Sequence, residues 1–372
     1  MAQTTFGVNH PLAVSVWSKS LAIEAYRKTF IGKFIGEGED SLIQEKTDLK
    51  KSAGDNITFG LNVQLQGDGV QGDATLEGNE EALQFYDDNL VINQLRHASR
   101  TKGRMTEQRV PYDLRQTSRN RLADWYARRY DTCFFNQICG NTAVTDTRFT
   151  GNNAVTAPTA NRIIRAGNRA TDELLEDGDT FKLQHIDAAR ERAETASIEN
   201  NTGPLIRPIR YMGSDYYVMF LHDYQVTDLR TDTSSQGLDW LDIQQAAMSG
   251  GDVERNPIFT GALGVYNGVV LHKAARVTQG VHSTTGLNID TTRRAVLCGA
   301  QAAIIAFGSD NGASRYNWFE ELFDYGNQFG VAAGSIFGLK KTRYVPEDDA
   351  TVNNEDFGTV VVSTRATPTA PV

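Results

Sequence analysis

The sequence has few of the residues that usually carry acid–base or metal chemistry. Its 372 residues include only 6 histidines and 3 cysteines, and it contains no HExxH, CxxC or GxSxG motif. Prolines are also few, at 9, whereas glycines number 33, a composition typical of a turn-rich chain. These absences favour a structural or binding role over catalysis, and no set of residues predicts a metal site, a catalytic group or a bound cofactor.

Long hydrophobic runs and targeting signals are missing as well. The densest apolar run, 302–307, is far shorter than the about 20 residues of a membrane-spanning helix. The first seven residues show no signal-peptide pattern. Cys133 and Cys139 lie six residues apart on different sides of an expected helix, so they cannot form a disulfide there. We expect a soluble protein with reduced thiols, made in a cytoplasm.

The length predicts two to three folding units, and the net charge is −9. Helical spacing predicts a broken helix over 12–35, interrupted near Gly32, and a long helix over 111–139 that begins at Pro111 and stops at Gly140. A further helix over 181–196 would be capped by Asp179 or Thr180. Strand-like apolar stretches follow at 216–221, 268–271, 295–307 and 360–362.

The clearest pattern is the alternation over 57–65. Period two over nine residues predicts a strand with one apolar and one polar face. A loop rich in Gly and Asp (66–79) and two extended stretches (83–86 and 90–95) follow, which predicts a projecting β-hairpin. Because such a hairpin is barely stable alone, its apolar face needs a partner surface. The alternating apolar residues are Ile57, Phe59, Leu61, Val63 and Leu65.

The hairpin loop also matches a nucleotide-binding pattern, over Gly67-Asp68-Gly69-Val70-Gln71-Gly72. The context contradicts this interpretation. The preceding strand alternates instead of being uniformly apolar, and no helix is indicated after the loop. Asp68 and Asp73 would also repel a pyrophosphate. A hairpin loop is therefore the favoured interpretation.

Residues 96–129 are strongly basic within an acidic chain. They contain ten Lys or Arg residues against three acids. One interpretation is a nucleic-acid-binding face. The favoured one is a set of ion pairs, within or between chains, to the acidic loop 66–79 and the acidic tail 346–356, because arginine suits geometrically fixed ion pairs.

A series of short motifs extends nearly from end to end of the chain. It begins with Gly7-Val8-Asn9 and Phe34-Ile35-Gly36, and continues through the hairpin loop to Leu76-Glu77-Gly78-Asn79-Glu80-Glu81. Later members are Gln94-Leu95-Arg96-His97-Ala98, Asn256-Pro257-Ile258-Phe259, Asp324-Tyr325-Gly326-Asn327 and Asp356-Phe357-Gly358. In this ordered set the chain resembles the major capsid proteins of tailed bacteriophages, specifically the N4-like family with the Hong Kong 97 type capsid fold.

The resemblance implies an α+β capsid fold in five segments. These are an N-terminal arm (1–50), an extended β-hairpin loop (51–105), a peripheral domain with a spine helix (106–205), an axial domain (206–330) and C-terminal strands that return to the peripheral domain (331–372). It implies a non-enzymatic virion protein, assembled in the host cytoplasm.

The implied partners are other copies of the chain, associated as hexamers and pentamers into an icosahedral head around double-stranded DNA. The resemblance also implies contacts with a portal and with a scaffold or decoration protein. It implies no contact with a membrane. The expected assembly residues are Trp17, Ile57, Phe59, Leu61, Val63, Leu65, Asp68, Asp73, Arg104, Arg109 and Arg115. Two alternatives stay open: another virion part, such as a tail or decoration protein, and an α+β enzyme that uses an acidic pair.

Overall fold

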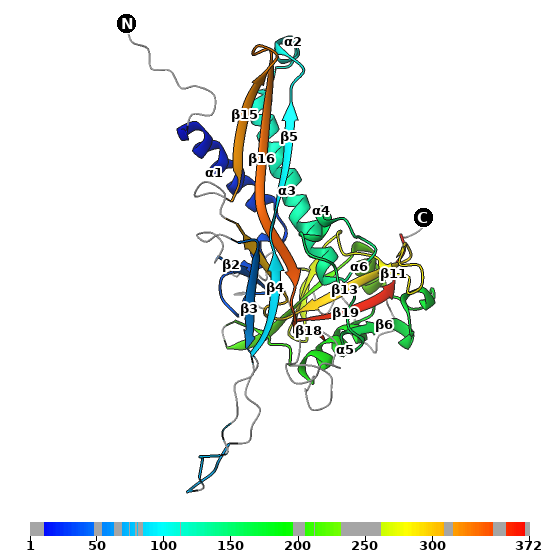
Figure 1. The fold of residues 1–372 in the computed structure, drawn as a ribbon. Coiled ribbons are helices and arrows are strands. Elements are labelled where there is room, and N and C mark those ends of the chain that lie inside the picture. The colour runs from blue at the N-terminus through cyan, green and yellow to red at the C-terminus, as the bar shows by residue number, and fades with distance from the viewer. Residues whose placement is uncertain are drawn as a thin grey trace.

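The computed structural model describes residues 11–47, 54–62, 69–73, 75–78, 80, 85–111, 113–195, 205–211, 213–231, 262–308, 315–344 and 355–368. They form two lobes and a hairpin that points away from both (Figure 1). We call the narrow lobe around helix α3 (Leu114–Ile138) the spine lobe. The broader one, built around a seven-stranded sheet, is the second lobe. The mixed α+β class expected from the sequence is confirmed.

Helix α3 runs along the spine lobe. Its 25 residues make it about 38 Å long at 1.5 Å per residue. The predicted start at Pro111 is wrong, because the helix begins at Leu114. The Asp113 carboxylate caps it by accepting hydrogen bonds from two free N–H groups of the first turn. Its end is as predicted: Gly140 has φ +65°, where a side chain would collide with a neighbouring loop.

A six-stranded sheet packs on α3. Its order is β1-β2-β14-β16-β15, and β5 pairs with β16. The hydroxyl of Tyr126 in α3 donates to the carbonyl of Ala333 at 2.7 Å, and that of Tyr130 donates to Ser335 Oγ at 3.0 Å. The helix is therefore tied to the long central strand. The strands are β1 (Ile35–Gly36), β2 (Ile43–Lys46), β5 (Asn93–Arg100), β14 (Ala303–Phe307), β15 (Asn317–Phe323) and β16 (Gln328–Lys341).

The second lobe is built on a seven-stranded sheet of order β6-β19-β13-β8-β10-β9, with β7 paired to β8. Helix α5 (Leu183–Glu194) contributes its apolar side to a core that includes Ile186, Leu297 and Val362. The strands predicted at 216–221, 268–271 and 360–362 are confirmed as β8, β10 and β19. The strands are β6 (Ile163–Arg165), β7 (Ile209–Tyr211), β8 (Ser214–Leu221), β9 (Gly264–Tyr266), β10 (Val269–Lys273), β13 (Thr292–Cys298) and β19 (Thr359–Arg365).

The remaining elements are short and connect these parts. Helix α6 (Asp223–Thr231) follows β8, and α2 (Arg104–Arg109) joins β5 to α3 at the tip of the spine lobe (Figure 1). The others are α4 (Thr147–Thr150), η3 (Ala160–Arg162), η4 (Ala166–Asn168), η5 (Asp172–Leu174), β11 (Gly280–Val281), β12 (Asn288–Ile289), β17 (Arg343–Tyr344) and β18 (Glu355–Asp356).

The boundaries of the five expected segments stay a prediction, and the strands of one segment can belong to different sheets of the structure. The last strand, β19, pairs with β13 and with β6, and β6 falls in the segment 106–205 that was expected to be the peripheral domain. Conversely, β14 and β15 fall in the segment expected to be axial, yet lie in the sheet on α3. Strand β5 falls in the expected hairpin segment and also joins that sheet. Local patterns identify strands, but they do not determine which strands pair.

The helix predicted over 181–196 is confirmed as α5, but its predicted caps are wrong. The N–H of Lys182 donates instead to Nδ1 of His185 at 3.0 Å. Asp179 lies before the helix and accepts from Nε of Arg169 at 2.9 Å. The carboxylate is therefore used to close a loop rather than to start the helix.

The broken helix predicted at the N-terminus consists of α1 (Pro11–Lys28) and the 3-10 turn η1 (Ile31–Phe34). The N–H groups at the break, of Phe30 and Ile31, donate to the Asp131 carboxylate of α3 at 3.3 and 3.2 Å. Arg276 of the second lobe pairs with the same buried carboxylate at 2.8 Å. Asp131 thus joins the N-terminal segment and both lobes at one point.

The predicted hairpin is confirmed where it is described. Strand β3 (Asn56–Asn62) pairs antiparallel with β4 (Phe85–Val91). Ile57 and Phe59, each 5% exposed, pack against the chain's own Ile304 and Tyr344. At the base of the hairpin the apolar face therefore finds the partner surface it needs within its own chain, whereas its role in contacts between copies stays a prediction.

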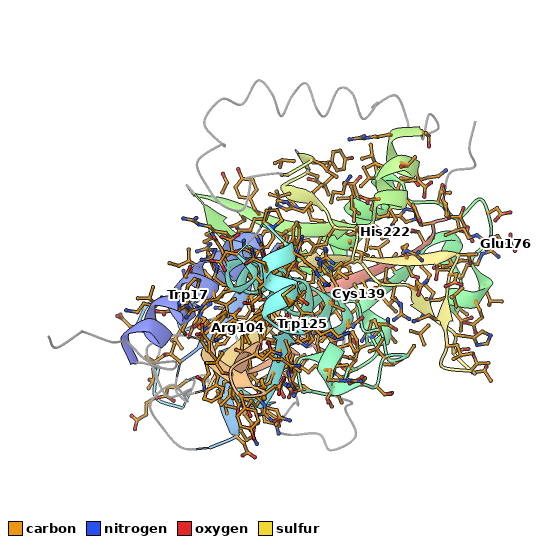
Figure 2. All side chains as sticks on the ribbon, turned by 90° about the horizontal axis from the view of Figure 1, so that it is seen from above. Trp17, Arg104, Trp125, Cys139, Glu176 and His222 are labelled. Carbon is orange, nitrogen blue, oxygen red and sulfur yellow. The ribbon has the colours of Figure 1, made fainter. Side chains whose placement is uncertain are left out.

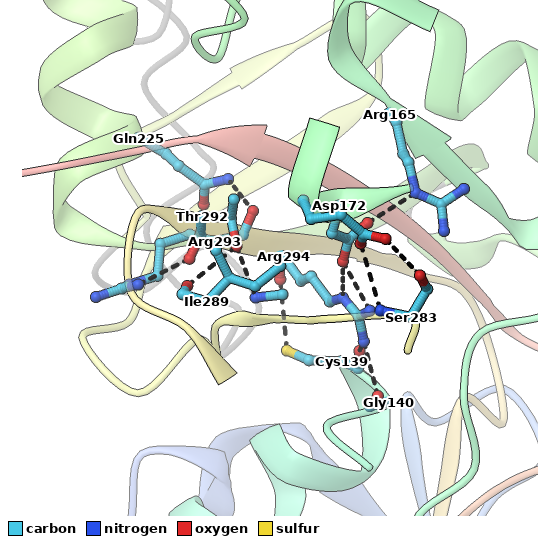
Figure 3. Close-up of polar contacts among 12 residues, drawn as sticks. Cys139, Gly140, Arg165, Asp172, Gln225, Ser283, Ile289, Thr292, Arg293 and Arg294 are labelled. Carbon is cyan, nitrogen blue, oxygen red and sulfur yellow. Dashed lines mark hydrogen bonds and ion pairs between the residues drawn. The ribbon is translucent and has the colours of Figure 1, made fainter. Parts of the chain in front are cut away.

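A buried ion-pair network joins the end of α3 to the second lobe (Figure 3). Arg294 of β13 pairs with Asp172 at 2.7 Å and donates to the carbonyl oxygens of Cys139 and Gly140 at 3.2 and 2.7 Å. Nε of Arg165 donates to the other oxygen of the same carboxylate at 2.7 Å. The last carbonyls of the spine helix are thereby bound by a cation, which suits the negative end of the helix dipole.

Candidate assembly interface

Trp17 and Arg115, expected separately as assembly residues, meet within the chain. The Trp17 ring stacks on that of Trp318 with centroids 6.0 Å apart, and the Arg115 guanidinium lies 4.6 Å from the Trp17 ring. Arg119 lies 5.7 Å from the same ring. These contacts fix α1 against the spine lobe, so Trp17 holds the N-terminal helix in place on its own chain.

Several arginines of the basic segment have partners within the described part of their own chain. Nε and Nη2 of Arg115 donate to the two carboxylate oxygens of Glu320 in β15, each at 2.7 Å. Nε1 of Trp318 donates to the same carboxylate at 2.8 Å. Arg129 lies 3.9 Å from the Phe149 ring. The described partners include β15, neighbouring aromatic rings and Asp124 of α3, whereas ion pairs to the acidic loop and tail stay a prediction, because 66–68, 74, 79 and 346–354 lie outside the described residues.

Several large apolar side chains face solvent on two parts of the spine lobe. On α1, Val16 and Ile23 are 65% and 55% exposed and lie seven residues apart, on one side of the helix. The remaining members lie on β15, α2 and the β15–β16 turn, and they are Phe319, Leu322, Met105 and Tyr325. Exposed apolar side chains gathered in this way mark surfaces for contact with other proteins.

The tip of the spine lobe carries the other expected basic residues. Arg104 and Arg109 lie at the two ends of α2, and both are exposed. Figure 2 views the molecule along this lobe from its tip, with Arg104 and Trp17 labelled on α2 and α1. Beneath α2 is an open cleft of about 380 Å³, which Arg104 and Arg115 line together with Phe329 and others.

The hairpin loop supplies the acidic side of the expected interface. Asp73 is exposed, and so are Leu76 and Glu77 in the same described stretch. Val63, Leu65 and Asp68 lie outside the described residues, and for Leu61 only the backbone is described. The interface role of these residues stays a prediction.

The structure gives no support to the nucleotide interpretation. Gly69 and Gly72 have φ +70° and +69°, as expected for a turn, and no helix follows within the described residues 69–73 and 75–78. Within the described parts of the chain, no cluster of His, Cys, Asp or Glu could hold a metal ion, and no helix there is long and apolar enough to span a bilayer.

The cysteines are buried and not bonded to one another. Burial raises the pKa of the Cys133 thiol to about 12 and also raises the pKa values of Cys139 and Cys298. Thiols in this state are inert. The sequence-based expectation of reduced cysteines is consistent with this arrangement.

The apex of the β15–β16 turn was not among the expected interface residues. Asp324, Tyr325 and Gly326 all have positive φ values, from +51° to +84°. An Asp and a Gly with one residue between them, after an amphipathic strand, are a turn signal that could have located this apex. Its exposed tyrosine is visible only in the structure.

The whole chain is similar to bacteriophage capsid proteins. Residues 5–368 match a family described as "Phage capsid protein". The major capsid protein of Pseudomonas phage KPP25 is 30% identical over an alignment of 384 residues, which covers 95% of each chain. These matches favour neither the enzyme nor the tail or decoration protein.

Solved structures agree. The capsid protein in the structure of the Ralstonia phage GP4 capsid is 34% identical to this chain. The alignment covers 100% of each chain and has a TM-score of 0.79. The cyanophage Pam1 capsid shares the fold at 20% identity, with 92% of this chain and 93% of that chain covered and a TM-score of 0.62. With its spine helix, projecting hairpin and two sheets, the chain has the Hong Kong 97 type of fold, and it belongs to the phage capsid protein family, whose function is capsid assembly.

Proposed function

We propose that this chain forms hexamers and pentamers that close into an icosahedral head around double-stranded DNA, in the manner of the N4-like capsid proteins. It performs no reaction in this role. Assembly takes place in the host cytoplasm, and a portal, and a scaffold or decoration protein, contact the shell. The family match over residues 5–368 is the observation that carries self-assembly.

The hairpin is the element that we assign to the contact between neighbouring copies. Its described outer part, 69–73 and 75–78, lies beyond the paired strands and away from both lobes (Figure 1). Leu76 there is 59% exposed. Because most of its described residues are exposed, the outer part presents a surface that a neighbouring copy can cover.

The distribution of charged residues indicates which surface of a neighbouring copy the hairpin contacts. The loop 66–79 carries acidic residues and no basic ones, whereas β5, α2 and the start of α3 are rich in arginine. Asp73 on the hairpin and Arg109 on α2 are both exposed. Opposite charges across an interface fix its register and exclude wrong partners. We therefore place Asp73 of one copy on the basic surface near Arg109 of another.

A charge-exchange experiment tests this contact. Asp73→Lys and Arg109→Glu should each prevent shells, since each puts like charges together, and the double variant should form shells again. Electron microscopy with light scattering reads out assembly. Asp177→Lys reverses an acid whose side chain is 92% exposed in the second lobe and serves as the control. Shells from both single variants would exclude this contact.

The apolar part of the hairpin is tested separately. Leu61→Asp or Val63→Asp should leave a folded monomer and block shells, because the outer apolar face would no longer pack on a neighbour. Circular dichroism checks the fold, and electron microscopy checks assembly. Normal shells from both variants would contradict the proposed role of the hairpin.

A further inference from the structure

The turn between β15 and β16 holds an aromatic residue in an unfavourable backbone conformation. Asp324 and Tyr325 have φ +52° and +51°, a region in which Asp is tolerated and a bulky residue is a rare outlier. The turn is well fixed. The N–H of Gly326 donates to the carbonyl of Phe323 at 3.2 Å, and that of Asn327 donates to the carbonyl of Asp324 at 2.9 Å.

The Tyr325 side chain gains no packing in its own chain. It exposes 109% of its reference area, so no contact within the chain offsets the strain of its backbone. Strain of this kind gathers at functional sites. A rigid turn that presents a bare aromatic ring therefore indicates a contact with another molecule, and tyrosine is among the residues that most often dominate such contacts.

A cleft opens on the same tip, next to this turn. Its volume is about 380 Å³, and Gly326 and Asn327 of the turn contribute to its wall. Its apolar lining comes from Leu114, Leu322 and Phe329, and its charged lining includes Arg104, Glu107 and Asp113. Tyr325 is not among the lining residues and its ring is fully exposed, so it does not fill the cleft of its own copy.

The chemistry of the cleft suits a tyrosine. Leucine and phenylalanine side chains can pack on its ring, and the carboxylates of Glu107 and Asp113 can accept a hydrogen bond from its hydroxyl. The Arg104 guanidinium can lie on the ring face. The Arg104 side chain is exposed at the start of α2 and lines this cleft.

We propose that Tyr325 of one copy inserts into the cleft beside Arg104 and Leu322 of a second copy. Every copy carries both the ring and the cleft at one end, so copies that meet at their tips can join head to tail around an axis. Each insertion would bury about 150–250 Å² of aromatic surface. This inference rests on the proposed self-assembly of the chain. The contact itself does not involve the hairpin.

The variant Tyr325→Gly separates the role of the ring from the stability of the fold. Glycine adopts positive φ freely, so the unassembled variant should unfold at the same temperature as the unaltered protein or higher. The concentration needed for shell formation should nevertheless rise by about tenfold or more. As a control, Leu287→Ala removes another exposed apolar side chain, 67% exposed and in the second lobe, and should assemble normally.

Cross-linking locates the partner of the ring. Copies with Tyr325→Cys are mixed with copies with Arg104→Cys and an excess of unaltered protein, assembled, and treated with a short bismaleimide. Covalent dimers should form only in shells that contain both variants. The three native cysteines are buried and should not react.

The experiment is run where the unaltered protein forms shells, so a failure of self-assembly is seen before any variant is compared. If Tyr325→Gly forms shells at the same concentration as the unaltered protein, the proposal is overturned. The exposed ring would then be a contact for a different virion protein. Mixed shells without covalent dimers would overturn it as well. Delayed assembly together with dimers specific to the mixture supports it.

Discussion

The buried ion pair between Asp172 and Arg294 should be essential to the joint between the lobes. Asp172 is 2% exposed and Arg294 is 4% exposed. The carboxylate accepts from Nε of Arg294 at 2.8 Å, while Nη1 of the same guanidinium holds the carbonyl oxygen of Gly140 at the end of α3. Asp172→Ala leaves this guanidinium buried without its counter-charge.

The expected cost follows from burial. Removing one partner of a buried ion pair typically destabilises a protein by about 3–5 kcal/mol, because the other charge stays desolvated. Asp177→Ala removes a carboxylate that also pairs with an arginine, Arg365, but the Asp177 side chain is 92% exposed. An exposed pair contributes at most about 1 kcal/mol. The two aspartates therefore differ in burial and in the number of arginines they bind, since Asp172 also accepts from Arg165.

Urea unfolding of the unassembled variants, followed by circular dichroism, measures the difference. We expect Asp172→Ala to lose at least about 2 kcal/mol more than Asp177→Ala. Asp172→Ala combined with Arg294→Met should recover part of the loss, since it also removes the stranded charge. Equal losses for the two aspartate variants would refute the reasoning that burial makes this pair matter.

Four further outcomes are expected. Phe59→Ala should lower the free energy of unfolding by about 3–5 kcal/mol in urea titrations, because the ring is in the core of its own chain. Trp17→Ala should speed hydrogen exchange in α1, measured by mass spectrometry, since the stack on Trp318 is lost. Burial, and then the charge of Arg293, lowers the pKa of His222 to about 4, so stability should fall as the pH drops from about 6.5 towards 4, less steeply in His222→Gln. Ellman's reagent should detect no thiol in the folded protein and all 3 in urea.

Elements with a strong local signal could be predicted from the sequence. The alternation from Ile57 onward identified β3, and Gly140 marked the end of α3, because both depend on residues close in the chain. The start of α3 was misplaced by three residues, since Pro111 suits a first turn but Asp113 supplies the cap.

Long-range partners could not be predicted in the same way. Arg115 pairs with Glu320, 205 residues away, and nothing in either local sequence indicates the other. The same holds for Ile57 and Phe59, whose alternation shows an apolar face but not the surface that covers it. At the candidate interface, the sequence located the basic and acidic segments, whereas the strained Tyr325 depends on a φ value that only the fold reveals.

The position of β19 has a consequence for how copies become available for assembly. This strand, residues 359–365, comes after every other strand of the seven-stranded sheet in the sequence, yet it lies between β6 and β13. Strand β6 can therefore join the rest of this sheet only after the ribosome has made nearly all of the chain shown here. A prematurely terminated polypeptide would lack the strand that joins the edge strand β6 to β13. The second lobe is therefore expected to complete its fold only late in synthesis, because a pairing between residues so far apart in the sequence forms only when both strands exist.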